Sequence, residues 1–181
     1  MWTIPNLLTL FRIVLIPVMV ILYYLPYEWH SFAAAFVFWI ASLTDALDGY
    51  LARKLEQSTP FGAFLDPVAD KVMVTVALVL MVELYDSVWV TVPALIIVGR
   101  EITISALREW MSEIGERASV AVSMVGKVKT AAQMLAIIGL LSELWFFKWP
   151  GFILLYIATV LTFWSMYEYL RAAWVFMKMS K

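Results

Sequence analysis

Residues 45–70 read DALDGYLARKLEQSTPFGAFLDPVAD, and they place four aspartates between two strongly apolar segments. The segment before them is FAAAFVFWIASLT, and the segment after them is KVMVTVALVLMVEL. A charged side chain inside a bilayer costs about 2.5–3.5 kcal/mol on insertion scales, so such residues usually mark function. We therefore expect these carboxylates to hold something. The four are Asp45, Asp48, Asp66 and Asp70.

The composition of the whole chain is that of an integral membrane protein. Of its 181 residues, 64% are hydrophobic and 15% are charged, against roughly half and a quarter in soluble domains. The absence of cysteine excludes disulfides and thiolate metal sites, and the single histidine, His30, is far in sequence from the aspartates. The length predicts one domain over residues 1–181, and we expect no nucleic-acid partner.

The apolar segments are long enough to cross a bilayer, which takes about 20 residues. In lipid every backbone group must be hydrogen-bonded internally, and this favours helices over an open sheet. We therefore predict an all-α integral membrane protein with six transmembrane helices. Their expected ranges are 8–26, 31–54, 60–85, 88–111, 127–147 and 150–177.

Two short stretches at helix starts can also be interpreted. Residues 1–7 combine a tryptophan that suits the membrane interface with Pro5 and Asn6, which suit a helix start. They predict a short N-terminal interfacial segment that leads into the first span. Further on, Thr59 can cap the first amides of a helix, and Pro60 suits the first helical position.

Lysines and arginines gather at one end of the predicted bundle. They lie near the connections that follow the second and fourth spans and at the C-terminal end, whereas the connections YEWH and YDS at the opposite end contain none. Such positive charge marks the cytoplasmic side of a membrane. We therefore expect both termini and the acidic stretch to be cytoplasmic.

The spacing of the aspartates predicts a common site. The first two are three residues apart and the last two are four apart, so each pair lies on one face of its helix. The short turn at 55–59 predicts that the two helices are antiparallel neighbours with facing acids. Arg53 and Lys71 do not balance four carboxylates, so one or two divalent cations are expected, and oxygen ligands favour Mg²⁺ or Mn²⁺. Gly49 and Gly62 leave room for close helix packing and a ligand.

Two other interpretations of the acids are open. They could be ordinary charges at helix ends in water, and Asp45 and Asp48 are close enough to an end for this to hold for one of them. They could also form a proton or cation pathway of a transporter, which predicts charges near the midplane and broken helices in paired halves. The rarity of acids within spans disfavours the first alternative for the full set. The acids gather near one side of the membrane and no paired halves are seen, which disfavours the second.

The pattern D-x2-D-G-x2-A-R-x8-G-x3-D-x3-D is present without a gap and resembles the signature of the CDP-alcohol phosphatidyltransferases. The six-span layout resembles that family too, so the likeness covers essentially the whole chain. Within the family, the chain is similar to bacterial members whose acceptor is glycerol 3-phosphate. That finer likeness rests on IPNLLTLFR at 4–12, FGAFLDPVADK at 61–71, REITISALREW at 100–110 and VGKVKT at 125–130.

The resemblance implies a reaction in which CDP-diacylglycerol and glycerol 3-phosphate give phosphatidylglycerophosphate and CMP. It implies a homodimer in the bacterial cytoplasmic membrane, with the active site facing the cytoplasm. It also implies two divalent ions, Mg²⁺ or Mn²⁺, held by the four aspartates, with Asp70 also accepting the proton of the attacking hydroxyl. The residues implied at the CDP-diacylglycerol site are Gly49, Ala52 and Arg53, with Asn6, Thr9 and Arg12.

A second group of charged residues suits the acceptor. Arg100 and Arg108 are eight residues apart, near the same face of one helix, and Lys127 and Lys129 open the next. Guanidinium groups grip phosphates through paired hydrogen bonds, and lysines add positive charge. We predict that these four cations bind the acceptor phosphate and that Glu101 orients one of them. The two lysines could instead set topology or contact anionic headgroups.

The identity of the acceptor and the route of transfer stay open at this level. Cations for a phosphate disfavour serine and phosphatidylglycerol as acceptors, but an inositol phosphate remains possible. Transfer could be direct or pass through an enzyme intermediate. Because the predicted site offers no better nucleophile than a carboxylate, direct attack is favoured.

Overall fold

The structure is a computed structural model that describes residues 3–55, 59–113 and 124–179. Within the helices it leaves aside the side chains of residues 5, 48–55, 60, 63, 113, 124, 125, 127, 172, 173 and 175–179. The described residues form helices and no strand, which confirms the all-α prediction. The helices are α1 (Ile4–Tyr23), α2 (His30–Leu55), α3 (Pro60–Tyr85), α4 (Val88–Glu113), α5 (Met124–Leu141) and α6 (Trp145–Met179).

Among the described residues, four helices are long and apolar enough to cross a membrane by themselves. The helix α3 is not among them, because every stretch of span length within it contains Asp70, Lys71 and at least one further charge. The apolar part of α5 is shorter than a span. The four candidate spans are Asn6–Tyr23, His30–Leu47, Val88–Ser112 and Trp145–Arg171.

The start of α1 differs from the prediction. The helix begins at Ile4, with Thr3 extended before it and a proline in its first turn. Proline is favoured there because the first amides of a helix have no partner inside it. Residues 4–7 of the expected interfacial segment form the first turns of α1, residues 1–2 lie outside the described chain, and the position of the segment at the membrane interface stays a prediction.

The turn between α5 and α6 also comes earlier than predicted. The Ser142 hydroxyl donates to the Gly139 carbonyl oxygen at 3.0 Å, and Glu143 adopts a left-handed conformation with φ 54°. A side chain that bonds to the preceding turn competes with continued helix formation. As a result α5 stops at Leu141 and α6 begins at Trp145.

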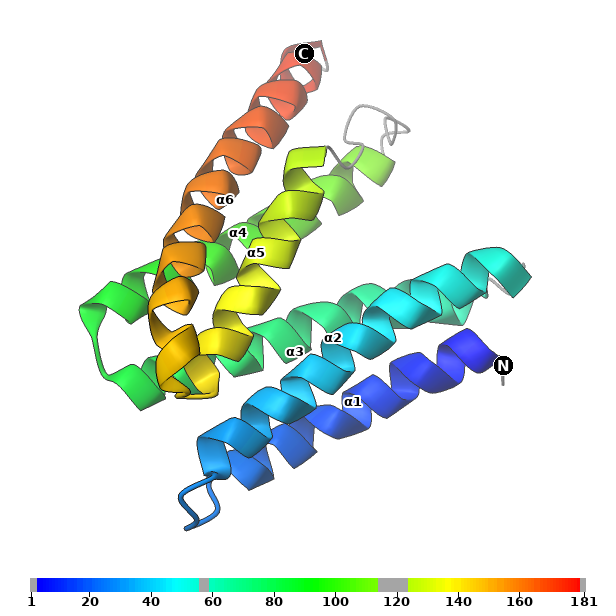
Figure 1. The fold of residues 1–181 in the computed structure, drawn as a ribbon. Helices are drawn as coiled ribbons and strands as arrows, with labels where there is room; N and C mark the ends of the chain where they lie inside the picture. The colour runs from blue at the N-terminus through cyan, green and yellow to red at the C-terminus, as the bar shows by residue number, and fades with distance from the viewer. Residues whose placement is uncertain (1–2, 56–58, 114–123, 180–181) are drawn as a thin grey trace.

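The helices alternate in direction, so that both ends of the described chain lie toward the end where α2 finishes and α3 begins (Figure 1). The helix α1 packs against both α2 and α3, while α6 packs against α4 and α5. The helices α2 and α3 touch each other only slightly. They are antiparallel as predicted, and α1 packs against both of them.

Two apolar clusters flank a polar layer. The larger cluster joins α1–α6 and includes fully buried Phe38 and Ile97. The smaller one joins α4 and α6 through Ile104 and Tyr169. On α4 the polar residues between Ile97 and Ile104 include Arg100 and Glu101. The core is therefore interrupted toward the end where the helices spread apart in Figure 1.

Candidate active site

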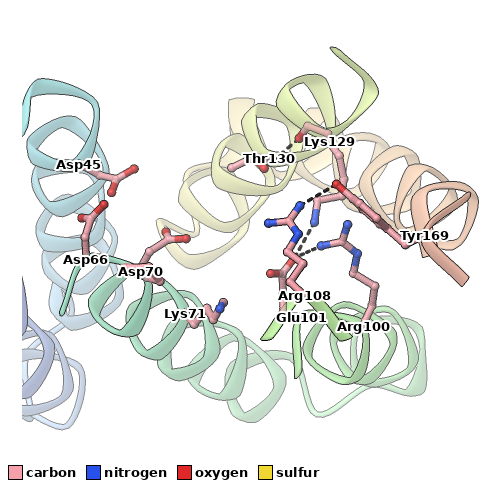
Figure 2. Close-up of a pocket in the computed structure, with 12 residues that line it drawn as sticks. Asp45, Asp66, Asp70, Lys71, Arg100, Glu101, Arg108, Lys129, Thr130 and Tyr169 are labelled. Carbon is pink, nitrogen blue, oxygen red and sulfur yellow. Dashed lines mark hydrogen bonds and ion pairs between the residues drawn. The ribbon is translucent and has the colours of Figure 1, made fainter. Parts of the chain in front are cut away.

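A cavity of about 340 Å³ lies among five helices, α2 to α6, at this end of the bundle. Its described lining separates into two charged sides (Figure 2). The acidic wall consists of Asp45, Asp66 and Asp70, from α2 and α3. The basic wall consists of Arg100, Arg108 and Lys129, with Glu101 and Tyr169, from α4, α5 and α6. The cavity is also lined by Pro67, Lys71, Gly126 and Thr130.

The predicted meeting of aspartates from two helices is confirmed for three of the four. Asp45 on α2 lies beside Asp66 on α3, and Asp70, one turn further along α3, points toward the same space (Figure 2). Lys71 follows Asp70 and lies between the two walls in the same view. The side chain of Asp48, the fourth predicted member, lies outside the described residues.

A buried arginine from α1 joins the two helices that carry these acids. Arg12 is 1% exposed, and its Nη1 lies 2.5 Å from Oδ1 of Asp45, while its Nη2 lies 3.2 Å from Oδ1 of Asp66. An arginine within an apolar helix needs anionic or polar partners, and this was the signal in the sequence. The resemblance placed Arg12 at the nucleotide site, and its ion pairs with the aspartates were missed.

The first turn of α1 sits against the first turn of α3. The predicted cap at Thr59 is confirmed, because its Oγ1 accepts from the Gly62 amide at 3.0 Å. The same oxygen accepts from Nδ2 of Asn6 at 2.9 Å. A Cβ at Gly62 would lie 2.3 Å from Oδ1 of Asn6, so only glycine allows this approach. Gly62 therefore makes room for α1.

Three residues of α1 predicted for the lipid-nucleotide site share one buried face. Asn6, Thr9 and Arg12 follow each other at intervals of three residues and are 2%, 3% and 1% exposed. This spacing keeps side chains on one side of a helix. The face of α1 that carries them includes the contacts to Thr59 and to the acidic wall.

The basic wall is connected through Glu101. Its Oε1 accepts from Nη1 of Arg100 at 2.9 Å and from Nζ of Lys129 at 2.5 Å. Both cations are buried, and Arg100 also donates from Nη2 to Oγ of Ser165 at 2.9 Å. A shared carboxylate between two buried cations lowers their mutual repulsion and fixes their positions.

The helix α6 completes the basic wall. Nη2 of Arg108 donates to the Tyr169 hydroxyl at 2.6 Å, and the guanidinium carbons of Arg100 and Arg108 lie 5.5 and 5.0 Å from the centre of the Tyr169 ring. Cations at such distances are attracted to an aromatic face. Sequence reasoning missed Ser165 and Tyr169. Their spacing of four on a mostly apolar helix was the available signal.

Two other polar residues of α6, Tyr167 and Glu168, are not part of the cavity lining. Tyr167 is 63% exposed, and Glu168 accepts a hydrogen bond from Nε1 of Trp164 at 3.0 Å. Five predicted site residues cannot be placed, because their side chains lie outside the described part of the structure. They are Asp48, Gly49, Ala52, Arg53 and Lys127.

The acidic wall has the donor chemistry that a hard divalent cation needs. Its donors are all carboxylate oxygens, which Mg²⁺ and Mn²⁺ prefer. The buried Oδ1 of Asp66 makes an ion pair but accepts no hydrogen bond. Among the described side chains, no group of three potential ligands is close enough to hold a metal ion. The chemistry of the wall fits a divalent cation, and the side chain of Asp48, the fourth predicted ligand, lies outside the described residues.

The two walls together suit a substrate with separate ends. The described lining holds four acids and four cations, of which three acids form the acidic wall and three cations lie in the basic wall. Glu101 lies among the cations as their counter-ion, and Lys71 lies between the two walls. The basic wall can bind a phosphate or another anion through positioned donors. A carboxylate of the acidic wall can accept a proton from a group held opposite.

Comparison with known proteins identifies the family to which the chain is related. The model of the CDP-alcohol phosphatidyltransferase family matches residues 2–164. A CDP-diacylglycerol–glycerol-3-phosphate 3-phosphatidyltransferase of Yersinia pestis (strain Pestoides F) is 59% identical over 177 residues, covering 94% of each chain. The protein of the same name from Escherichia coli (strain K12) is 58% identical over 174 residues, covering 95% of each chain.

Proposed function

The chain belongs to the CDP-alcohol phosphatidyltransferase family, and from this premise we propose that it transfers the phosphatidyl group of CDP-diacylglycerol to glycerol 3-phosphate. The products are phosphatidylglycerophosphate and CMP, so the enzyme acts in phospholipid biosynthesis. The observation that carries the proposal is that an acidic wall and a basic wall face each other in one cavity. A phosphorylated alcohol has a phosphate that the basic wall can bind and a hydroxyl that can face the acidic wall.

The proposed chemistry is a direct displacement at phosphorus. A hydroxyl oxygen of glycerol 3-phosphate attacks the phosphorus that carries the diacylglycerol, and the bond from that phosphorus to the bridging oxygen breaks. CMP leaves with the electron pair, and Asp70 accepts the proton of the attacking hydroxyl. Asp70 suits this role because it lines the cavity toward the basic wall.

We assign the acceptor phosphate to the basic wall. Arg100 and Lys129 are held by Glu101 before any ligand arrives, so little side-chain ordering is needed on binding. Arg108 is exposed and bonded only through its tip to Tyr169 among the described contacts. It is suited to reach toward the phosphate from the exposed edge of the basic wall, and Lys127 is assigned to the same phosphate from its charge and its place in the sequence beside Lys129.

Divalent cations complete the proposal. Asp45, Asp48, Asp66 and Asp70 would hold two ions, Mg²⁺ or Mn²⁺, which would neutralise the diphosphate as CMP leaves. Arg12 contributes from α1, where its ion pairs hold the carboxylates of Asp45 and Asp66 in position. Gly49, Ala52 and Arg53, with Asn6 and Thr9, would bind the CDP-diacylglycerol headgroup.

We further propose that all six helices cross the bacterial cytoplasmic membrane, with the cavity and both termini on the cytoplasmic side. The helix α3 has 26 residues, and its buried Leu78 and Met81 belong to the main core. The concentration of lysine and arginine at the cavity end supports the orientation. The family resemblance also suggests a homodimer, which the mass of the purified particle would test.

The deciding experiment measures CMP release by the purified protein. Glycerol 3-phosphate and CDP-diacylglycerol with Mg²⁺ or Mn²⁺ should give CMP and phosphatidylglycerophosphate in equal amounts. Chelation by EDTA should abolish the reaction, and either ion should restore it. No CMP release with any acceptor would refute the proposal, and would leave a cation transporter as the alternative. Release only with an inositol phosphate would change the acceptor.

A further inference from the structure

A small side pocket adjoins the main cavity at its inner edge. It has a volume of about 40 Å³ and shares Asp70, Lys71, Glu101 and Thr130 with the cavity lining. Its remaining described lining comes from Val74, Gln133 and Met134. The pocket therefore lies between the acidic wall and the basic wall, next to the proposed proton acceptor.

Gln133 gives this pocket an unsatisfied polar group. The residue is 3% exposed, and its Oε1 is buried without a hydrogen-bond partner among the described residues. Buried polar atoms in native proteins almost always have a partner, and an exception calls for an absent water or ligand. Gln133 lies one turn beyond Lys129 on α5, so both side chains are on the same face of the helix.

The neighbouring polar groups do not supply that partner. The Thr130 hydroxyl donates to the Gly126 carbonyl oxygen at 3.0 Å. Lys129 donates to Glu101 at 2.5 Å and lies in the basic wall. Gln133 lines the pocket, its amide oxygen has no partner among the described residues, and Thr130 and Lys129 are engaged elsewhere. Lys71 is the other cation that lines the pocket, and a hydroxyl that enters the pocket would give the amide oxygen a hydrogen-bond donor.

We propose that Gln133 is a specificity-determining residue that accepts a hydrogen bond from the non-reacting hydroxyl of the acceptor. This inference rests on the proposed function. Glycerol 3-phosphate has a phosphate for the basic wall, a terminal hydroxyl for Asp70, and a secondary hydroxyl between them. The side pocket lies between the same two groups of residues.

The size of the pocket limits which part of the acceptor can enter it. A volume of about 40 Å³ admits a hydroxyl or a water molecule, and the rest of the acceptor would lie in the adjoining cavity of about 340 Å³. The acceptor favoured by Gln133 is therefore a phosphorylated alcohol with a hydroxyl next to the reacting carbon. A bound water would also satisfy the amide oxygen, and Gln133 would then have only a structural role.

The test compares two acceptors that differ by this hydroxyl. 3-Hydroxypropyl phosphate keeps the phosphate and the reacting hydroxyl of glycerol 3-phosphate but lacks the secondary hydroxyl. Sites that bond a substrate hydroxyl reject the analogue without it strongly. The wild-type enzyme should therefore favour glycerol 3-phosphate in kcat/KM by about 10- to 100-fold, because the analogue leaves a buried acceptor without a partner.

The matching variant is Gln133→Met, which keeps the length of the side chain and removes the amide. It should lower kcat/KM for glycerol 3-phosphate and change the value for the analogue little, so that the preference falls toward 1. Gln133→Asn keeps the amide on a shorter chain, and it should give an intermediate preference. Gln133→Asn also tests the role of the amide if Gln133→Met does not fold, and thermal unfolding in detergent shows whether each variant is folded.

The outcomes separate this inference from the proposed function. Absence of preference in the wild-type enzyme, or an equal fall for both acceptors in Gln133→Met, would overturn the role of Gln133 and leave the transferase intact. Failure of the wild-type enzyme to release CMP from glycerol 3-phosphate would instead refute the function. An unchanged KM for CDP-diacylglycerol in both variants is expected, because Gln133 lies on the acceptor side.

Discussion

The acidic wall and the basic wall are built in opposite ways. The acidic wall comes from one short stretch of sequence, and two of its carboxylates are held from outside by Arg12 of α1. The basic wall gathers residues from three helices and contains its own counter-ion, Glu101. The first is thus defined by a motif and the second by helix packing.

This difference separates chemistry from recognition. The carboxylates of the acidic wall are partly exposed to the cavity, so they remain available for a cation or a proton. The cations of the basic wall at Arg100 and Lys129 are buried and already bonded, so their geometry is fixed before a ligand binds. Changes in the acidic wall should therefore affect turnover, and changes in the basic wall should affect acceptor binding.

The largest expected effect comes from Asp70→Asn. The amide has nearly the same shape but cannot accept the proton, and general bases contribute about 10²- to 10⁴-fold to rate. We expect kcat to fall by that factor with the fold unchanged, measured as CMP release and thermal unfolding. Asp86→Asn is the matched control, because Asp86 is exposed at a left-handed position that asparagine tolerates. A wild-type rate in Asp70→Asn would remove Asp70 from its role.

An intermediate effect is expected from Arg100→Ala. The variant removes one charged hydrogen-bonding group from the basic wall but leaves the Lys129–Glu101 pair in place. The KM for glycerol 3-phosphate should rise about 10- to 100-fold, since charged hydrogen bonds contribute roughly 1.5–3 kcal/mol, while the KM for CDP-diacylglycerol should change little. Arg171→Ala, at an exposed position on α6, should leave both values unchanged. Equal rises in both KM values would contradict the division between the walls.

The smallest effect concerns stability and uses a glycine beside each wall. In Gly62→Ala, the new Cβ would displace the Asn6 side chain from its bonds with Thr59, at a cost of about 1–3 kcal/mol. In Gly99→Ala nothing lies within 4 Å of the new atom, and alanine should stabilise α4 by roughly 0.5–1 kcal/mol. Unfolding in detergent measures both, and shifts of the same sign would contradict the close approach at Gly62.

The sequence alone predicted the structural features that depend on local residue patterns. Apolar length predicted the helices, and the cap at Thr59 followed from side-chain chemistry. Fixed spacing predicted the meeting of Asp45 with Asp66 and Asp70. These features depend on residues close together in the chain, where helix periodicity alone determines which side chains share a face.

Contacts between distant segments could not be predicted in the same way. Tyr169 reaches Arg108 across 61 residues, and Ser165 reaches Arg100 across 65. Nothing in the local sequence states which face of α6 packs on α4. The buried amide of Gln133 was missed for the same reason, since a single glutamine in an apolar helix gains meaning only from its surroundings.

Arg12 has a consequence for how the protein is made. By length and composition α1 qualifies as a span, yet it carries a cation whose burial in lipid alone would cost about 2.5–3.5 kcal/mol. Asp45, which pairs with that cation, is 33 residues further along the chain. During synthesis Arg12 gains its partner Asp45 only after α2 has been made, and we therefore expect α1 and α2 to enter the membrane as one unit.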